Sequence, residues 1–210
     1  MQNCFCLGDR WVHGNRRRVN ARQRVPDAFR KRLSAQPARC YRNPDVLTPP
    51  DSHFFSAAIG WLELGNPREA QAELDRIAPV HQRDAEVLDV RWMALAQEKD
   101  WARSLEVARV QLAGHPDHPA GWLHQAYALR RVGGGGLEAA WSALLPASER
   151  FPTEPTIPYN LACYACQRRQ LEEARQWLQR AMKVGGRDPL RQMALKDPDL
   201  EPLWEEIRRW

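Results

Sequence analysis

Apolar residues return along most of this chain with the period of an α-helix. The clearest stretch covers residues 158–182, where two helical patterns are separated by a short polar turn. Its small and apolar positions fall three or four residues apart on each pattern: Leu161, Ala162, Ala165, Leu171, Ala174, Leu178 and Ala181. This spacing is typical of helices that bury one stripe of side chains. The pattern therefore predicts two amphipathic helices that pack back to back.

The same arrangement occurs three more times upstream, at a nearly constant distance. Small residues mark the equivalent place in four successive copies, 34, 36 and 34 residues apart: Ala70, Ser104, Ala140 and Ala174. Proline ends the second and third copies, at Pro116 and Pro152. A fixed period of this length is typical of stacked helical hairpins. A plain antiparallel bundle would show the same stripes without a small residue at constant phase, so we favour the stacked arrangement.

These hairpins resemble the tetratricopeptide repeat (TPR) family, and the resemblance covers residues 51–184. The expected repeats span about 51–84, 85–118, 119–154 and 155–184. The resemblance implies an all-α, right-handed α-solenoid of about four TPR-like hairpins, as in bacterial TPR-containing proteins. Three features depart from the family pattern. Trp92 replaces a small residue, Arg91 and Gln125 replace leucines, and the third hinge, which contains the glycines at 133–136, is two residues longer than the others.

The two ends differ from the repeats. Residues 185–210 contain a helix stop at Gly185 and Gly186 and two helix-start signals, at Asp188 and Asp197, each followed by proline. We expect this segment to form a helical cap over the last repeat rather than a partner-binding element. Residues 1–50 contain five prolines and no apolar period, so we expect a largely disordered extension.

Charge is concentrated in that extension. Residues 1–50 contain 11 Lys and Arg against 3 Asp, a net charge of +8, whereas the other 160 residues contain 20 against 23, a net of −3. The excess of basic residues therefore does not indicate that the folded part binds nucleic acid. Three interpretations of the extension stay open: an arm that touches nucleic acid or an anionic membrane, an organelle transit peptide, or an upstream segment that is not normally translated. We favour the last.

Cysteine usage and hydropathy indicate the compartment. The five cysteines, an odd number, are scattered as Cys4, Cys6, Cys40, Cys163 and Cys166, which does not suggest a disulfide framework. A reducing, cytoplasmic setting is the simpler interpretation. No run of about eighteen apolar residues predicts a membrane span, and no apolar segment suitable for a secretory signal follows the basic start.

Candidate chemical sites are few, and each has a structural explanation. Cys163 and Cys166 form a C-x-x-C string inside a helix, where small side chains lining the helix explain them better than redox chemistry or zinc. His115 and His118 lie in an inter-repeat turn, and the glycines at 133–136 lack the Gly-Lys-Ser/Thr ending of a phosphate loop. We therefore expect no catalytic residue, no metal site and no cofactor.

In the TPR family the first helix of each repeat lines a concave groove that holds peptide segments. The resemblance places twelve residues of this chain in such a groove: Phe55, Ile59, Asp89, Met93, Leu123, His124, Tyr127, Arg130, Arg131, Tyr159, Asn160 and Gln167. Cys163 falls at the same phase. Arg130 and Arg131 offer charge to an acidic group, although solvated helix-end charges explain them equally well.

The resemblance implies a non-catalytic adaptor or scaffold that binds a protein or peptide on its concave face. The alternative is association of the basic extension with nucleic acid or an anionic surface, with the repeats as a docking module. An enzyme would require a metal or cofactor that the motifs do not indicate. The partner itself cannot be read from a fold shared by unrelated processes.

Overall fold

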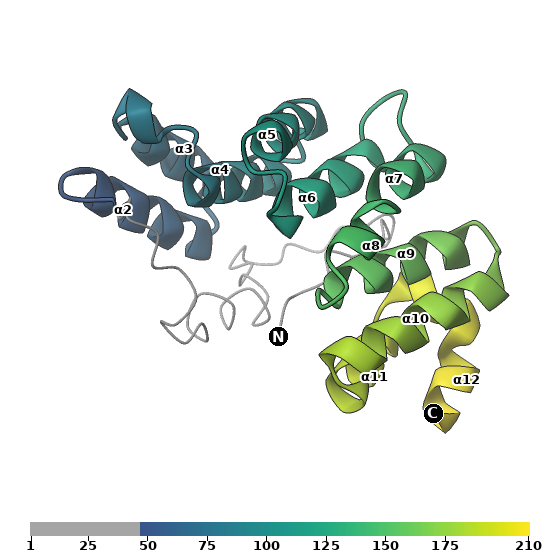
Figure 1. Ribbon diagram of the computed structural model, residues 1–210. Coiled ribbons are helices and arrows are strands. Elements are labelled where there is room, and N and C mark those ends of the chain that lie inside the picture. Colours follow the sequence, from purple (N-terminus) through teal and green to yellow (C-terminus); the bar gives the residue numbers. More distant parts are fainter. Residues whose placement is uncertain (1–46) are drawn as a thin grey trace, which may run out of the picture. The chain divides into compact units, whose positions relative to one another are not determined.

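The computed structural model describes residues 47–210, and every regular element in this part of the chain is a helix (Figure 1). The predicted all-α class is thereby confirmed. The interpretations of residues 1–46, including the basic arm and the first three cysteines, lie outside the described residues. The elements are α2 Asp51–Glu63, α3 Pro67–Asp75, η1 Pro79–His81, α4 Ala85–Gln97, α5 Trp101–Gly114, α6 Pro119–Leu129, α7 Leu137–Leu144, α8 Ala147–Arg150, α9 Thr156–Gln167, α10 Leu171–Gly185, α11 Arg187–Ala194, η2 Pro198–Leu203 and α12 Trp204–Arg209.

The described residues divide into two compact units, 47–136 and 137–210. The division falls directly after the glycines at 133–136, inside the stretch predicted as the third repeat. The boundaries of the four repeats therefore stay a prediction. Each unit has its own core and is described by itself.

The unit of residues 47–136 packs the hairpin α2–α3 against α4, and α4 and α5 against α6. Its first hairpin and α4 share one hydrophobic cluster: Ala58, Leu62, Ala70, Leu74, Ile77, Val87, Val90 and Ala94. Ala70 and Ser104, the two phase-marking residues of this unit, are completely buried. Close packing at such positions needs small side chains, because helices that cross tightly leave no room for larger ones.

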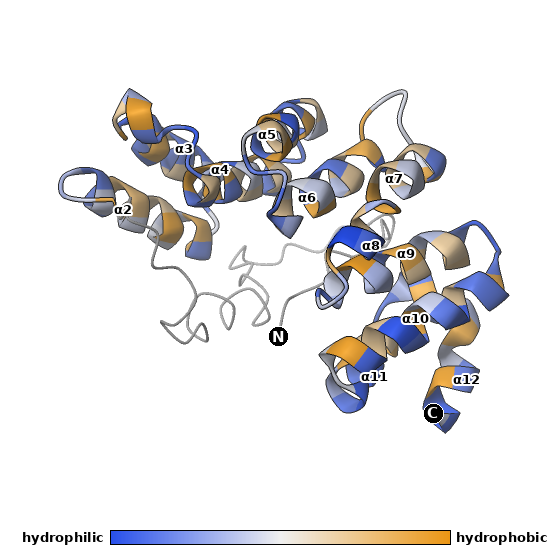
Figure 2. Cartoon of the chain, viewed as in Figure 1, coloured by the Kyte–Doolittle hydropathy of each residue, from blue (hydrophilic) through white to orange (hydrophobic). Residues whose placement is uncertain are grey.

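The unit of residues 137–210 is built on the hairpin α9–α10. Ala174 of α10 and Ala140 of α7 are completely buried, as their phase predicts. The segment after Gly185 folds back onto this hairpin, with α11 beside α10 and η2 beside α9. It buries Leu200, Leu203 and Ile207 completely. In Figure 2 hydrophobic and hydrophilic segments alternate along α10, α11 and α12, as amphipathic helices require.

Three hinges share one backbone motif, although only one of them contains glycine. Gly65, Lys99 and Arg169 have positive φ angles of 74°, 59° and 63°. In each case the next residue donates its N–H to the carbonyl five residues back; Asp100 N lies 3.0 Å from Leu95 O. This is the Schellman ending of a helix, which favours glycine at the left-handed position. Lys99 and Arg169 are therefore strained non-glycine residues at equivalent places.

The departures from the family pattern in α4 have structural partners. Trp92 is completely buried and stacks on His124 with ring centroids 4.0 Å apart. Arg91 donates Nη1 to Asp75 at 2.7 Å and Nη2 to Gln82 Oε1 at 2.7 Å, so it bonds where a leucine would pack. These contacts explain how the second hairpin tolerates large and charged side chains.

Candidate functional site

The first helices of the unit 47–136 present side chains at a common phase. Phe55, Asp89 and Leu123 are 34 residues apart, and so are Ile59, Met93 and Tyr127. With Arg131, which follows the C-cap of α6, these residues of α2, α4 and α6 define what we call the first-helix face. Because α4 contacts both α2 and α6, the three helices form one continuous surface.

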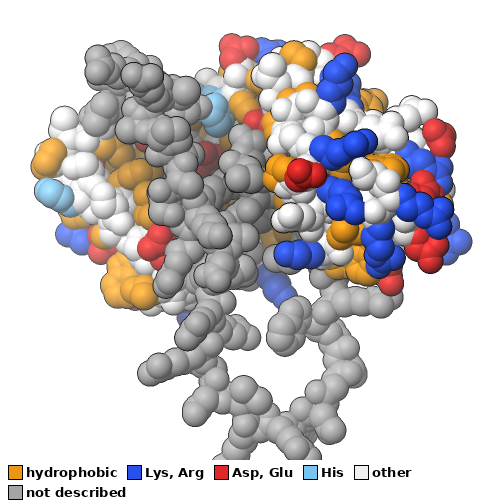
Figure 3. All heavy atoms as spheres, turned by 90° about the horizontal axis from the view of Figure 1, so that it is seen from below, with side chains coloured by type: hydrophobic (Ala, Val, Ile, Leu, Met, Phe, Trp, Pro, Cys, Tyr) orange, Lys and Arg blue, Asp and Glu red, His pale blue; other side chains and the backbone are white. Residues whose placement is uncertain are grey.

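The end of the first-helix face on α2 and α4 is apolar. Phe55, Ile59 and Met93 are each only partly buried, although all three pack against the core cluster of the unit. Hydrophobic side chains are visible on the surface of this unit in Figure 3, outside the grey atoms. Partly buried apolar side chains in a row offer contact area to a partner segment.

The end on α6 is aromatic and basic. The guanidinium carbon of Arg131 lies 3.6 Å from the centroid of the Tyr127 ring and 5.5 Å from that of Trp101. Arg131 Nη1 also donates to the carbonyl of Tyr127 at 3.2 Å. This stacking fixes the cation, because a cation over an aromatic face is attracted by the ring electrons. The sequence does not predict Trp101 as a groove residue, because Trp101 begins α5, the second helix of its hairpin.

Two predicted groove residues are engaged inside the fold. Gln111 Nε2 donates to Asp89 Oδ1 at 2.6 Å, and Gln111 Oε1 lies 2.9 Å from His124 Nδ1. His124 is buried, with 7% of its surface exposed, whereas Asp89 is partly exposed. The burial of His124 removes it from the candidate binding surface and makes it a link between α5 and α6. Arg130 forms the C-cap of α6 and stays partly exposed.

The equivalent positions in the unit 137–210 contact another segment of the same chain, the start of η2. Tyr159, Cys163 and Gln167 lie 36 residues after Leu123, Tyr127 and Arg131, since the third hinge is two residues longer. Tyr159 donates its hydroxyl to Asp197 Oδ2 at 3.1 Å, and Cys163 Sγ lies 3.6 Å from the same oxygen. Gln167 Nε2 donates to the carbonyl of Asp199 at 2.9 Å. The start of η2 therefore lies on this helix face.

Two further predicted groove residues, Tyr159 and Asn160, are buried in this unit. Tyr159 is completely buried, and Asn160 donates Nδ2 to the carbonyl of Thr156 in its own helix at 2.8 Å. Gln167 is exposed but is already bonded to Asp199. The phase of these residues does not indicate that the η2 segment packs against α9.

Asp197 is the most strongly perturbed carboxyl group of this cluster. Burial raises the pKa of Asp197 to about 6, and the charge of Asp199 acts in the same direction. Three donors oppose the shift: the N–H of Asp199 at 3.0 Å from Oδ1, the Tyr159 hydroxyl and the Cys163 thiol. Burial also raises the pKa of Cys166 to about 11, helped by the charges of Asp199 and Asp197. Cys166 is thus a poor nucleophile at neutral pH.

The sulfur of Cys163 and carboxylate oxygens of Asp197 and Asp199 lie within 4.8 Å of one another, a grouping that could in principle hold a metal ion. Each oxygen of Asp197 already accepts a hydrogen bond from the protein. The grouping is therefore explained as the anchor of the cap on α9. His115 and His118 also have structural roles: His115 Nε2 lies 2.9 Å from the carbonyl of Arg83, and His118 caps α6.

The described part of the chain contains no helix that is both long and apolar enough to cross a membrane. No protein-family profile matches the chain, and no curated protein matches it either.

Solved structures do resemble it. TTC0263, a thermophilic TPR protein of Thermus thermophilus, is 16% identical with a TM-score of 0.58, covering 75% of this chain and 95% of that one. MamA 41-end from Desulfovibrio magneticus RS-1 is 20% identical with a TM-score of 0.56, covering 78% and 94%. A MamA RS-1 double mutant is 21% identical with a TM-score of 0.55, covering 78% and 97%.

Proposed function

Since this chain has the fold of TPR proteins, we propose that it is a non-catalytic scaffold that binds an extended segment of a partner protein on the first-helix face. The observation that carries the proposal is the row of partly exposed apolar and aromatic side chains on three successive first helices. Phe55, Ile59 and Met93 supply apolar contact, and Tyr127 with Arg131 supplies a polar end. A helix-lined surface of this kind holds a segment by side-chain anchors.

The two ends of the face suit a segment with apolar residues followed by an acidic group. Apolar anchors are most effective where the receiving side chains are already half-buried, because little ordering is then required on binding. The stacked guanidinium of Arg131 retains donors for a carboxylate, and a fixed fork loses less entropy than a mobile one. The buried cysteines are compatible with a reducing cytoplasm, which we propose as the setting.

The test compares partner capture by matched variants of the full chain. The tagged chain is incubated with lysate of its source organism, and captured proteins are quantified by mass spectrometry. Met93→Asp and Arg131→Glu change the first-helix face, whereas Val110→Asp and Arg109→Glu make the same changes on exposed positions of α5. We expect one set of partners to be lost with both face variants and retained with both controls.

A purified partner then provides the quantitative readout, by fluorescence anisotropy of its labelled binding segment. A charge placed among apolar contacts should weaken binding by about tenfold or more, as truncation of an interface anchor does. Circular dichroism checks that each variant is folded. If the four variants capture identical partners with equal affinity, the first-helix face is not the binding surface.

A further inference from the structure

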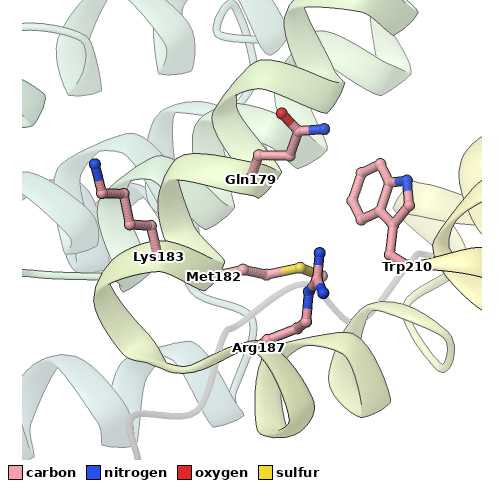
Figure 4. A pocket seen from close by; sticks show the side chains of 5 residues that line it. All are labelled: Gln179, Met182, Lys183, Arg187 and Trp210. Carbon is pink, nitrogen blue, oxygen red and sulfur yellow. The ribbon is translucent and has the colours of Figure 1, made fainter.

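The unit 137–210 contains a pocket of about 450 Å³. Its lining residues are separate from those of the first-helix face. Gln179, Met182 and Lys183 from the last turns of α10 form one wall. Arg187, the first residue of α11, and Trp210, directly after α12, form the others (Figure 4). Pockets that bind small molecules have volumes of roughly 300–1,000 Å³, so the size is suitable for such a ligand.

The walls are held by specific contacts. Gly186 turns the chain between α10 and α11 with φ of 91°, and a side chain on Gly185 would meet Pro155 at 2.7 Å. Two glycines are thus required to bring α11 back beside α10. Arg191 of α11 donates to the carbonyls of Ile207 and Arg208, which fixes the end of α12 next to the pocket.

The polar groups that line the pocket have no partner in the described part of the chain. Other arginines of α10 and α11 are bonded: Arg175 to Glu206, Arg180 to the carbonyl of Ser148, and Arg191 as above. The side chains of Gln179, Lys183 and Arg187 are exposed, and among the described residues neither they nor the Trp210 indole N–H form a hydrogen bond or ion pair. The buried Met182 supplies an apolar contact between them.

Figure 4 shows how these side chains lie. The Gln179 amide and the Arg187 guanidinium extend toward the space in front of the Trp210 indole, with the Met182 thioether beneath them. In this view the Lys183 side chain extends to the left, away from Trp210 and the Arg187 guanidinium. Figure 3 shows several Lys and Arg side chains on the surface of this unit. Asp188, in the first turn of α11, offsets the positive end of this helix, so the positive charge at the pocket comes from side chains.

We propose that this pocket binds a small organic anion that carries a planar ring. The guanidinium of Arg187 pairs with a phosphate or carboxylate through two parallel hydrogen bonds. The indole face of Trp210 stacks on the ring, and the Gln179 amide donates to or accepts from its polar edge. The proposal is independent of the first-helix face, since the two sites share no residue.

The experiment uses the full chain labelled with 5-fluorotryptophan and follows the fluorine resonances by NMR. Trp210→Phe identifies the resonance of Trp210 among the nine tryptophans. The probes are adenosine monophosphate and benzoate, as an anion with a planar base and a planar carboxylate, with adenosine and inorganic phosphate as the separate halves of adenosine monophosphate. We expect at least one planar anion to shift the Trp210 resonance, with affinity about tenfold higher than adenosine or phosphate alone.

Matched variants test whether Arg187 supplies the positive charge that binds the anion. Arg187→Gln should weaken binding of the planar anion by about tenfold, because a charge-assisted pair is lost. Lys196→Gln, an exposed lysine outside the pocket, removes the same charge and should leave binding unchanged. The proposal is overturned if neither planar anion shifts the Trp210 resonance at millimolar concentration. The proposal is also overturned if adenosine binds as tightly as adenosine monophosphate. The same holds if Lys196→Gln weakens binding as strongly as Arg187→Gln does.

Discussion

The buried carboxyl group of Asp197 makes the stability of the cap depend on pH in a direction opposite to that of most aspartates. Its pKa is raised from the ordinary value of 3.8 to about 6, chiefly by burial and then by the charge of Asp199. The groups that face it are Tyr159 and Cys163 of α9 and Asp199 of η2. The charged form is therefore disfavoured in the folded state.

The sign of the pH dependence of stability follows from the protons bound by the folded and unfolded states. Between pH 4 and pH 6 the folded protein retains the Asp197 proton while the unfolded chain has released it, so stability falls as pH rises through this window. A rise in pKa of this size lowers the free energy of unfolding by about 3 kcal/mol between low pH, where Asp197 is protonated in both states, and high pH, where it is ionised in both. Between pH 4.5 and pH 7.5 about 2 kcal/mol of this difference should be observed.

The assay is urea unfolding of the full chain and of Asp197→Asn, followed by circular dichroism at both pH values. Asparagine keeps an oxygen that accepts from the Asp199 N–H but carries no titrating proton. Titrations of groups distant from Asp197 are shared, so they cancel in the difference between the two proteins. The Asp197→Asn variant should gain about 2 kcal/mol relative to the natural protein on going from pH 4.5 to pH 7.5.

The exposed Asp188, substituted in the same way, is the control. Its substitution should have the same effect on the unfolding free energy at both pH values. A constant difference between the natural protein and Asp197→Asn would refute the raised pKa. A difference that changes with the opposite sign would mean that the three donors to Asp197 outweigh its burial.

Three further predictions concern backbone strain, core packing and thiol reactivity. Lys99→Gly should raise the unfolding free energy by about 1 kcal/mol, because glycine adopts the positive φ without strain, whereas Lys99→Ala should not; urea titration measures both. Leu178→Ala should lower it by about 3 kcal/mol, since Leu178 is completely buried, whereas Leu64→Ala at a 75% exposed position should change it by less than about 0.5 kcal/mol. Cys166 should resist alkylation at pH 8 in the native protein and react in urea, as peptide mapping would show, because its thiol is buried with a pKa of about 11.

The sequence predicts well what depends on local periodicity. The small residues at constant phase, from Ala70 to Ala174, are completely buried in the structure, because tight helix crossings leave a signal at each repeat. It predicts less well what depends on backbone strain. Lys99 and Arg169 adopt left-handed angles without the glycine that normally marks them, since the hydrogen bonds of the helix ending compensate for the strain.

Contacts between distant segments cannot be read from residue spacing. The sequence identifies Asp197 only as a helix-start residue, and its side chain does accept from the Asp199 N–H. Nothing local indicates that it also accepts from Tyr159, 38 residues away, or that Gln167 bonds to the carbonyl of Asp199. Such contacts are determined by how the cap packs as a whole, which depends on tertiary packing.

The two sets of equivalent first-helix positions differ in what they bind within the described residues. On α9, Tyr159 binds a carboxylate and Gln167 binds a backbone carbonyl of the chain's own η2 segment. On α6, Tyr127 and Arg131 occupy the places that correspond to Cys163 and Gln167, and both are only partly buried. A phenol and a cation can together bind the same two kinds of acceptor, a carboxylate and a carbonyl. Leu123 stands at the place of Tyr159, so on the function proposed above Arg131 is the group that would bind an acceptor of an extended segment, whereas the η2 segment already lies on this face of α9.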